Sequence, residues 1–248
     1  MPVKYPTLEQ RLALRERPAA RCVMRQVWRE LLFLHWRYEP GEIQRLLPPG
    51  LTVDCFDGAA WVGIVPFFMC GVCPVWCPPM PGLSNFLELN VRTYVHDEKG
   101  VPGVWFFSLD ASNAVAVFLA RTFFGLPYYR ARMRARATPA TLDYWSQRGE
   151  LPPDHFVYQP VGPARFAEAG SLEFFLAERY LLYSYDAKAG RLSSGRVHHR
   201  PYPLQDVKVL EHSTHLLAPA GLSQVTTPFD HAVYAREVDV EIFGLRHQ

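Results

Sequence analysis

An acidic and a basic side chain stand at alternate positions of one predicted strand. The sequence FLELNVRTYV, residues 86–95, alternates with period two, which is the spacing of side chains on the two faces of a strand. Glu88, Asn90 and Arg92 therefore share one face. A carboxylate can act as a general base, and an arginine can bind a carboxylate or phosphate through two hydrogen bonds. The same pattern is also typical of a buried ion-pair network without a ligand, so both interpretations stay open here.

A cluster of cysteines is the second candidate for chemistry. Cys70, Cys73 and Cys77 are spaced C-x2-C-x3-C before Pro78, and Cys55 would offer a fourth thiolate. The spacing is similar to the later part of a bacterial ferredoxin motif, and the same ligands would suit zinc. The first C-x2-C of that motif is missing. We therefore favour ordinary loop or core cysteines, and we predict neither a metal site nor a cofactor.

The histidines and the clustered arginines carry weaker signals. His212 and His215 are three residues apart, and His198 and His199 are adjacent. In strands such spacings say little about direction, so we expect solvated or hydrogen-bonded histidines rather than metal ligands. Arginines alternate with small or apolar residues over 130–136, which is typical of a solvent-facing strand.

The composition indicates an ordinary globular protein. The 248 residues are 49% hydrophobic and 20% charged, and the 22 prolines with 14% aromatic residues favour short strands and many turns. The net charge of +2 gives no reason to expect a nucleic-acid or membrane partner. Five cysteines, an odd number, and an N-terminus without an apolar secretory segment favour a reducing, cytoplasmic location.

One uncharged stretch is as long as a membrane-spanning segment. Residues 58–87 contain no Asp, Glu, Lys or Arg and are long enough to span a bilayer. Five prolines interrupt the stretch, and irregular backbone is not tolerated against lipid. We therefore predict a buried strand followed by an apolar loop.

Local patterns predict one α+β domain over residues 1–248, mainly antiparallel β, with residues 1–25 as a helical N-terminal extension. The best helix candidate follows Asn113 and stops at Gly125-Leu126-Pro127. The other predicted elements are helices over 7–17, 42–47 and 172–183, a strand from Val27, a hairpin over 51–67 with its turn at 56–58, and strands over 86–95, 101–110, 130–136, 195–204, 207–217 and 234–245.

Four segments occur in one order between about residues 27 and 204: WRELLFLHWRYEPGEIQRLLPPGLTVDCFDGAAWVGIVPF, FLELNVRTYV, FFSLDASNAVAVFLARTFFGLPYYRA and FLAERYLLYS. Together they resemble the YqjF-like family of uncharacterised bacterial proteins. That family is similar in fold to acetoacetate decarboxylase. The resemblance implies an antiparallel β-barrel or cone, with a few flanking helices and a ligand cavity inside.

The resemblance also implies which residues face that cavity. The decarboxylase has an Arg-Glu pair on its first strand, matched here by Arg29-Glu30, and an active-site glutamate, matched by Glu88. A Leu-Asp pair then leads through an arginine, here Arg121, to the motif Pro-Lys-Lys. The implied ligand-binding residues are Arg29, His35, Glu88, Arg92, Arg121, Tyr128 and Tyr129, of which Glu88, Tyr128 and Tyr129 are the catalytic candidates.

The departure from this pattern concerns the nucleophile. Where the decarboxylase has Pro-Lys-Lys, this chain has Pro127-Tyr128-Tyr129. A Schiff base requires a primary amine, and a phenol cannot replace it. The chain is therefore predicted not to be a Schiff-base acetoacetate decarboxylase.

The sequence leaves three functions open. The first is a barrel that binds a small anionic or oxo-bearing metabolite, with Arg29 or Arg92 holding the ligand and Glu88 moving protons. The second is a structural or interaction protein whose barrel is filled by its own aromatic side chains, without a cavity of roughly 300 Å³ or more. The third is a metal or cluster protein based on the cysteines. A homo-oligomer is compatible with each.

Overall fold

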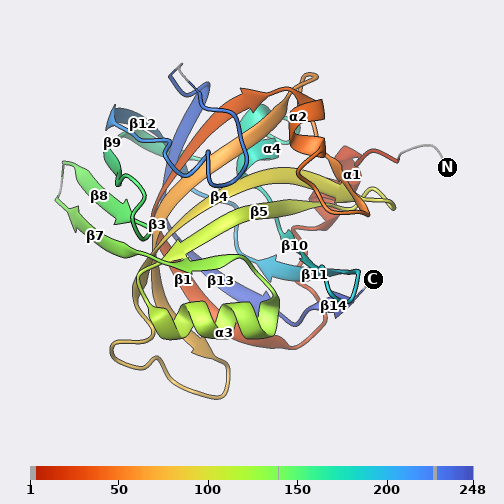
Figure 1. Ribbon diagram of the computed structural model, residues 1–248, viewed down its shortest axis with the longest axis horizontal. Helices are drawn as coiled ribbons and strands as arrows, with labels where there is room; N and C mark the ends of the chain where they lie inside the picture. Colours follow the sequence, from red (N-terminus) through yellow and green to blue (C-terminus); the bar gives the residue numbers. More distant parts are fainter. Residues whose placement is uncertain (1–3, 139, 226–227, 248) are drawn as a thin grey trace.

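The computed structural model describes residues 4–138, 140–225 and 228–247, and it is built mainly from antiparallel strands (Figure 1). The strands are β1 (Cys22–Tyr38), β2 (Leu51–Val53), β3 (Ala60–Pro74), β4 (Phe86–Asp97), β5 (Pro102–Ala111), β6 (Tyr128–Arg130), β7 (Arg132–Ala137), β8 (Leu142–Gln147), β9 (Asp154–Arg165), β10 (Leu181–Asp186), β11 (Arg191–His198), β12 (Leu204–Glu211), β13 (His231–Phe243) and β14 (Arg246–His247). The helices are α1 (Leu8–Ala13), α2 (Pro40–Gln44), α3 (Ala114–Phe124) and α4 (Leu172–Ala177). The predicted fold class is confirmed.

Seven strands close into a ring. Their order is β1, β3, β4, β5, β10, β11 and β13, and the pairing of β13 with β1 completes the circle. Neighbours in the ring are antiparallel except β5 and β10, which are parallel. A closed ring leaves no edge strand along its circumference, and successive side chains of each strand point alternately inward and outward.

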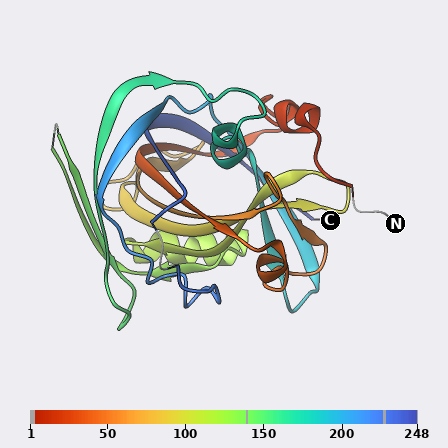
Figure 2. The ribbon, with the colours of Figure 1, turned by 90° about the horizontal axis from the view of Figure 1, so that it is seen from above.

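A second layer of strands covers one side of the ring. β12, β9, β8 and β7 continue the sheet from β13, and Figure 2 shows them as an outer wall beside the ring. Leu34 and Val91 of the ring share a buried cluster with Tyr144 and Phe156 of this wall. The hydroxyl of Tyr144 donates to the carbonyl oxygen of Glu88 at 2.7 Å. The outer layer thus supports β4 from the side opposite the ring's interior.

The prediction of a hairpin over 51–67 is wrong, because its two strands do not pair with each other. Its turn is present, because Asp57 and Gly58 have φ angles of 49° and 74° and Phe56 forms a bridge with Ala59. However, β2 pairs with β4, while β3 pairs with β1 and β4. A turn depends on local residues, whereas strand partners here are set by closure of the ring.

The predicted helix over 172–183 ends early. It begins after the N-cap Ser171 as expected, but α4 ends at Ala177 and β10 begins at Leu181. β10 continues the ring between β5 and β11, and its Leu181 and Tyr183 are buried. Tertiary pairing therefore overrides the local helical pattern.

Two proline-containing stretches form strands. Residues 60–74 are β3, followed by a loop at 75–85, as predicted for the uncharged stretch. Within the described ranges, no helix is long and apolar enough to cross a membrane. β9 has no counterpart among the predicted elements, because Pro160 and Pro163 within it are typical of loops.

The N-terminal segment is fixed to the ring by buried charges. α1 begins with a capping box formed by Thr7 and Gln10. The guanidinium of Arg11 donates two hydrogen bonds of 2.7 Å to Asp54, and Arg179 donates a third at 2.8 Å. Burial alone would raise the pKa of Asp54, but the two arginines outweigh burial, and the pKa is lowered.

We expect Asp54→Ala to lower the free energy of unfolding by about 3 kcal/mol, because Arg179 would become an uncompensated buried charge. Since the folded state lowers the pKa of Asp54, its contribution is present above the carboxyl's ordinary pKa and is lost as the pH falls. Urea unfolding at several pH values measures both effects. Glu241→Ala, which removes the partner of the exposed Arg17, is the control and should cost less than about 1 kcal/mol. Equal losses in the two variants would contradict this account.

Candidate functional site

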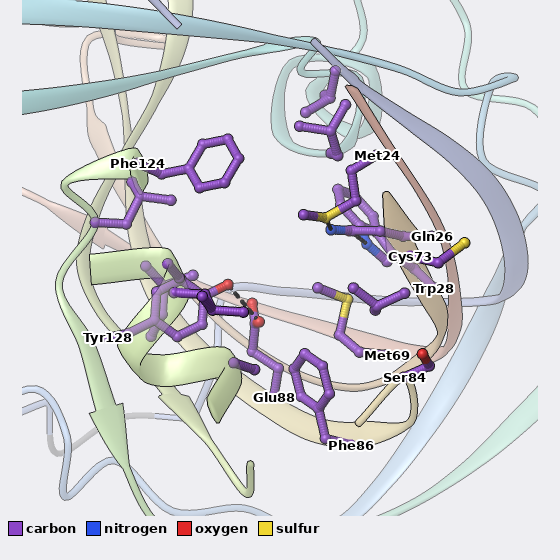
Figure 3. A pocket seen from close by; sticks show the side chains of 18 of the residues that line it. Met24, Gln26, Trp28, Met69, Cys73, Ser84, Phe86, Glu88, Phe124 and Tyr128 are labelled. Atoms are coloured by element: carbon purple, nitrogen blue, oxygen red, sulfur yellow. Dashed lines mark hydrogen bonds between the residues drawn. The ribbon is translucent and has the colours of Figure 1, made fainter. Parts of the chain in front are cut away.

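A cavity of about 330 Å³ lies inside the ring (Figure 3). Its wall is formed by side chains of the ring strands and of β6, together with the loop after β3 and the inner side of α3. Most of the lining is apolar, including Trp28, Phe67, Met69, Phe86 and Phe124. Polar side chains that line it are few and are concentrated on β4. A concave, mostly apolar cavity with a few placed polar groups is the usual form of a small-molecule site.

β4 supplies the polar wall of the cavity because of its period-two alternation. Phe86, Glu88, Asn90 and Arg92 all line the cavity, as the sequence pattern predicts for one face of the strand. The intervening Leu89 and Val91 are fully buried in the core between the ring and the outer layer. The apolar partners on the outer face therefore determine that the polar residues of β4 face inward.

Glu88 and Tyr128 form a hydrogen-bonded pair at the wall of the cavity. The Tyr128 hydroxyl donates to Glu88 Oε2 at 2.7 Å, and Figure 3 shows the two side chains pointing toward one another. Burial raises the pKa of Glu88 to about 7, although the hydrogen bonds from Tyr128 and Asn90 act in the opposite direction. Burial, followed by the nearby Glu88, raises the pKa of Tyr128 well above its ordinary value. Near neutral pH, Glu88 can therefore both accept and release a proton, while Tyr128 remains a hydrogen-bond donor.

Arg92 lies at another part of the same cavity. One guanidinium nitrogen, Nη2, donates to the carbonyl oxygen of Leu176 at 3.1 Å and reaches the hydroxyl of Tyr94 at 3.4 Å. Its Nε is buried and has no hydrogen-bond partner among the described residues. The Oδ1 atom of Asn90 is also buried and, within the same described part of the chain, unpartnered.

His35 is buried near Arg92 but does not line the cavity. Its Nε2 lies 2.7 Å from the Tyr94 hydroxyl, and its Nδ1 lies 3.4 Å from Nδ1 of His231. Burial, then His231 and Arg92, hold the pKa of His35 well below its ordinary value. His35 is therefore a neutral group that supports Tyr94, which in turn contacts Arg92.

Arg29 faces away from the cavity because it follows the inward-facing Trp28, and β1 changes phase directly after it. Trp28 lines the cavity before this point and Leu31 lines it afterwards, while Glu30 has a φ of 55° and the register with β3 shifts. Arg29 is about half exposed, and its Nε pairs with Glu237 at 2.7 Å. Strict alternation along β1 cannot predict this reversal.

Arg121 and Tyr129 belong to a different surface. Both line a second, more open hollow of about 470 Å³, together with Trp105 and Tyr185. Tyr129 is 41% exposed, and its ring lies 4.1 Å from the guanidinium carbon of Arg148. Of the two adjacent tyrosines, only Tyr128 thus meets Glu88, since successive residues of β6 point to opposite sides.

The mouth of the cavity lies between α3 and the loop after β3. Trp76 of the loop and Leu119 of α3 line the cavity and are also exposed, by 83% and 44%. Asn113 joins the two segments: its Oδ1 accepts from the first amides of α3, and its Nδ2 donates to the carbonyls of Gly82 and Leu83. The sequence predicts the N-cap of α3, but it does not predict that these residues border the cavity, because only the fold brings the two segments together.

The cysteines do not gather with other potential ligands. Cys73 and Cys77 line the cavity near its mouth, and the cysteines are free thiols. Burial, ahead of the weaker effects of nearby charges, raises the pKa of Cys70. Within residues 4–138, 140–225 and 228–247, no group of three or more His, Cys, Asp or Glu side chains could hold a metal ion.

The four lysines of the chain all lie in its described part, and all are exposed. None of these four side chains lines the cavity. They are Lys4, Lys99, Lys188 and Lys208. The side chain that contacts the buried carboxyl of Glu88 is the phenol of Tyr128, not a lysine.

The family model of an uncharacterized conserved protein, DUF2071, matches residues 25–239 of the chain. The chain belongs to the DUF2071 family. The uncharacterized protein YqjF of Bacillus subtilis (strain 168) is 37% identical to this DUF2071 protein over 228 residues, which cover 90% of this chain and 92% of YqjF. The predicted relationship to YqjF is therefore confirmed.

Solved structures with the same fold include several enzymes. Acetoacetate decarboxylase from Legionella pneumophila has a TM-score of 0.64 and 13% identity to this DUF2071 protein, covering 94% of this chain and 92% of that enzyme. The enduracididine biosynthesis enzyme MppR, complexed with pyruvate, has a TM-score of 0.64 and 14% identity, covering 94% and 93%. An acetoacetate decarboxylase-like enzyme from Sphingomonas wittichii RW1 has a TM-score of 0.63 and 14% identity, covering 92% and 93%. At these identities the likeness shows the fold, which is that of acetoacetate decarboxylase.

We expect Tyr128→Phe to raise the pKa of Glu88 by about one unit, because the lost hydrogen bond favours the charged carboxylate. The carboxylic-acid carbonyl band in infrared difference spectra, followed against pH, measures this pKa. Tyr129→Phe is the matched control and should leave the titration unchanged. If both variants shifted the pKa of Glu88 by the same amount, the effect would not be specific to the hydrogen bond from Tyr128, and the prediction would be wrong.

Glu88 also makes stability depend on pH in a defined direction. Its pKa is raised in the folded protein from 4.5 to about 7, so its favourable contribution is present at low pH and is lost as the pH rises through this range. We expect Glu88→Gln to gain stability relative to the unmodified protein across the same range, by on the order of 3 kcal/mol. Urea unfolding of both proteins tests this, and parallel pH profiles would refute it.

Proposed function

We propose that this protein binds a small anionic or oxo-bearing metabolite in the cavity and transfers a proton to or from it through Glu88. The observation that carries the proposal is the Glu88–Tyr128 pair, which lies in a mostly apolar cavity with the pKa of the carboxyl raised to about 7. A general base acts best when its pKa is close to the operating pH. The MppR complex with pyruvate supports an oxo-acid as ligand, since MppR has the same fold.

The chemistry follows from the two side chains. A carbonyl oxygen of the ligand would accept a hydrogen bond from the Tyr128 hydroxyl, which burial keeps protonated. Glu88 would remove a proton from the carbon next to that carbonyl and return it at the same or another position. Negative charge developing on the oxygen is stabilised by the phenol, as in an oxyanion hole. The reaction class is proton transfer next to a carbonyl group.

This chemistry does not use a covalent imine. An imine requires an unprotonated primary amine beside the carbonyl carbon, and the four exposed lysines lie outside the cavity lining. Tyr128 occupies the position that the resemblance assigns to the Schiff-base lysine. We therefore propose that the ligand is held by hydrogen bonds and charge alone.

The cavity argues against a barrel filled by its own aromatic side chains. Its volume of about 330 Å³ is within the range of small-molecule sites. In addition, two buried polar atoms at its wall, Nε of Arg92 and Oδ1 of Asn90, are without partners among the described residues. Buried polar groups normally have partners, so a bound molecule would satisfy them.

Proton transfer can be tested with phenylpyruvate, a 2-oxo acid with an aromatic body. We expect the unmodified protein to accelerate exchange of its methylene protons in heavy water, followed by NMR. Glu88→Gln should slow this exchange by about 100-fold or more, the usual contribution of a general base. Glu98→Gln, which alters an exposed carboxyl, should leave the rate unchanged. Exchange that is equally fast in both variants would rule out Glu88 as the base.

Covalent capture can be tested separately. After incubation with acetoacetate or pyruvate and borohydride, we expect the intact mass of the protein to be unchanged, because an imine would be reduced to a stable adduct. Release of carbon dioxide from acetoacetate should not exceed the background rate. A reduced adduct at any of the four lysines would overturn the lysine-free mechanism.

A further inference from the structure

Arg92 is a buried cation with no acidic partner among the described residues. It is 7% exposed and forms none of the ion pairs of the protein's described part. This contrasts with Arg179, which is equally buried but pairs with Asp54 at 2.8 Å. Leaving a buried charge unpaired is strongly unfavourable, so the absence of a counter-charge requires an explanation.

The groups around Arg92 satisfy it only in part. Nη2 uses the carbonyl of Leu176 and contacts the hydroxyl of Tyr94. The guanidinium carbon lies 5.3 Å from the ring centre of Phe33 and 5.7 Å from that of Tyr94, which adds cation–π attraction. None of these groups carries a full negative charge.

Other titratable groups near Arg92 do not supply the missing charge. Burial is the main reason that the pKa values of His35 and His199 are lowered, and Arg92 adds to the effect in both. Both histidines are therefore neutral at neutral pH. Glu178 is already engaged, since it accepts from the Tyr180 hydroxyl and the amide of Tyr202 and pairs with Arg15.

Arg92 and the Glu88–Tyr128 pair face the same cavity from one strand. Glu88 and Arg92 lie four residues apart on the same face of β4, with Asn90 between them. A strand rises about 3.3 Å per residue, so the two α-carbons lie on the order of 13 Å apart. The guanidinium of Arg92 reaches the hydroxyl of Tyr94, which is two residues further from Glu88 on the same strand, so the two polar groups remain well separated. The spacing suits a ligand with two polar groups rather than one.

We infer that Arg92 binds the carboxylate of the ligand, so that the substrates are oxo-monocarboxylic acids with an apolar body. In this arrangement the oxo group lies at Glu88 and Tyr128, the carboxylate meets the guanidinium of Arg92, and the apolar body extends toward Trp76 and Leu119 at the mouth. An arginine suits this task because its donors match the geometry of a carboxylate. The inference rests on the proposed function, which it makes more specific.

The test compares 4-oxo-4-phenylbutanoic acid, in which two methylene groups separate the oxo group from the carboxylate, with its methyl ester, which has the same oxo group and aromatic body but no charge. Isothermal titration calorimetry of the unmodified protein should show the acid binding at least about tenfold more tightly than the ester, as expected for a charge-assisted contact at a buried site. Because this comparison needs no substitution, it does not depend on whether a variant folds.

Variants then locate the contact. Arg92→Gln should remove the preference for the acid while keeping ester binding within about threefold, and Arg92→Lys should retain part of it because lysine keeps the charge but not the fork of donors. Arg29→Gln is the matched control, since Arg29 pairs with Glu237 outside the cavity, and it should leave the preference intact. Melting temperatures of all variants report folding independently.

The possible results separate the inference from the function on which it rests. If neither the acid nor the ester binds, the proposed function fails. If both bind equally well, or if Arg29→Gln rather than Arg92→Gln removes the preference, the carboxylate contact at Arg92 is refuted while the oxo-compound site stands. Tighter binding of the acid that disappears in Arg92→Gln alone supports the inference.

Discussion

The site depends on one constraint: a closed ring of strands forces the polar residues of β4 into an interior with few polar partners. Leu89 and Val91 must point outward to pack against the second layer, so Glu88, Asn90 and Arg92 have to point inward. Water cannot solvate them freely there. The consequences are a carboxyl that ionises only near neutral pH, and a guanidinium and an amide with unpartnered atoms among the described residues.

Solved structures with the same fold share little sequence with this chain, which indicates where the fold's requirements lie. Acetoacetate decarboxylase from Legionella pneumophila covers 94% of the chain at 13% identity. A ring of this kind needs alternation, turns and a packed outer layer, and many sequences provide them. The residues at the inner wall are not fixed by those needs. The inner wall of one ring can therefore carry different side chains, and in this chain it carries the phenol of Tyr128 beside Glu88.

Features that depend on neighbouring residues could be predicted from the sequence. The alternation of β4 correctly placed Glu88 and Arg92 together, and α3 begins at its N-cap Asn113 and ends before Gly125, whose φ is 59°. Features that depend on distant pairing could not. Nothing local distinguishes Tyr128 from Tyr129, although one is buried against Glu88 and the other is exposed beside Arg148.

The phase change at Glu30 has a consequence for how the gene can vary. Before it, Trp28 and the even-numbered positions face the interior, whereas Leu31 and Phe33 do so after it. Inserting or deleting one codon within β1 would turn the following half of the strand inside out, placing Leu32 and Leu34 in the cavity. The residue count of this strand is therefore fixed by the extra residue that it already contains.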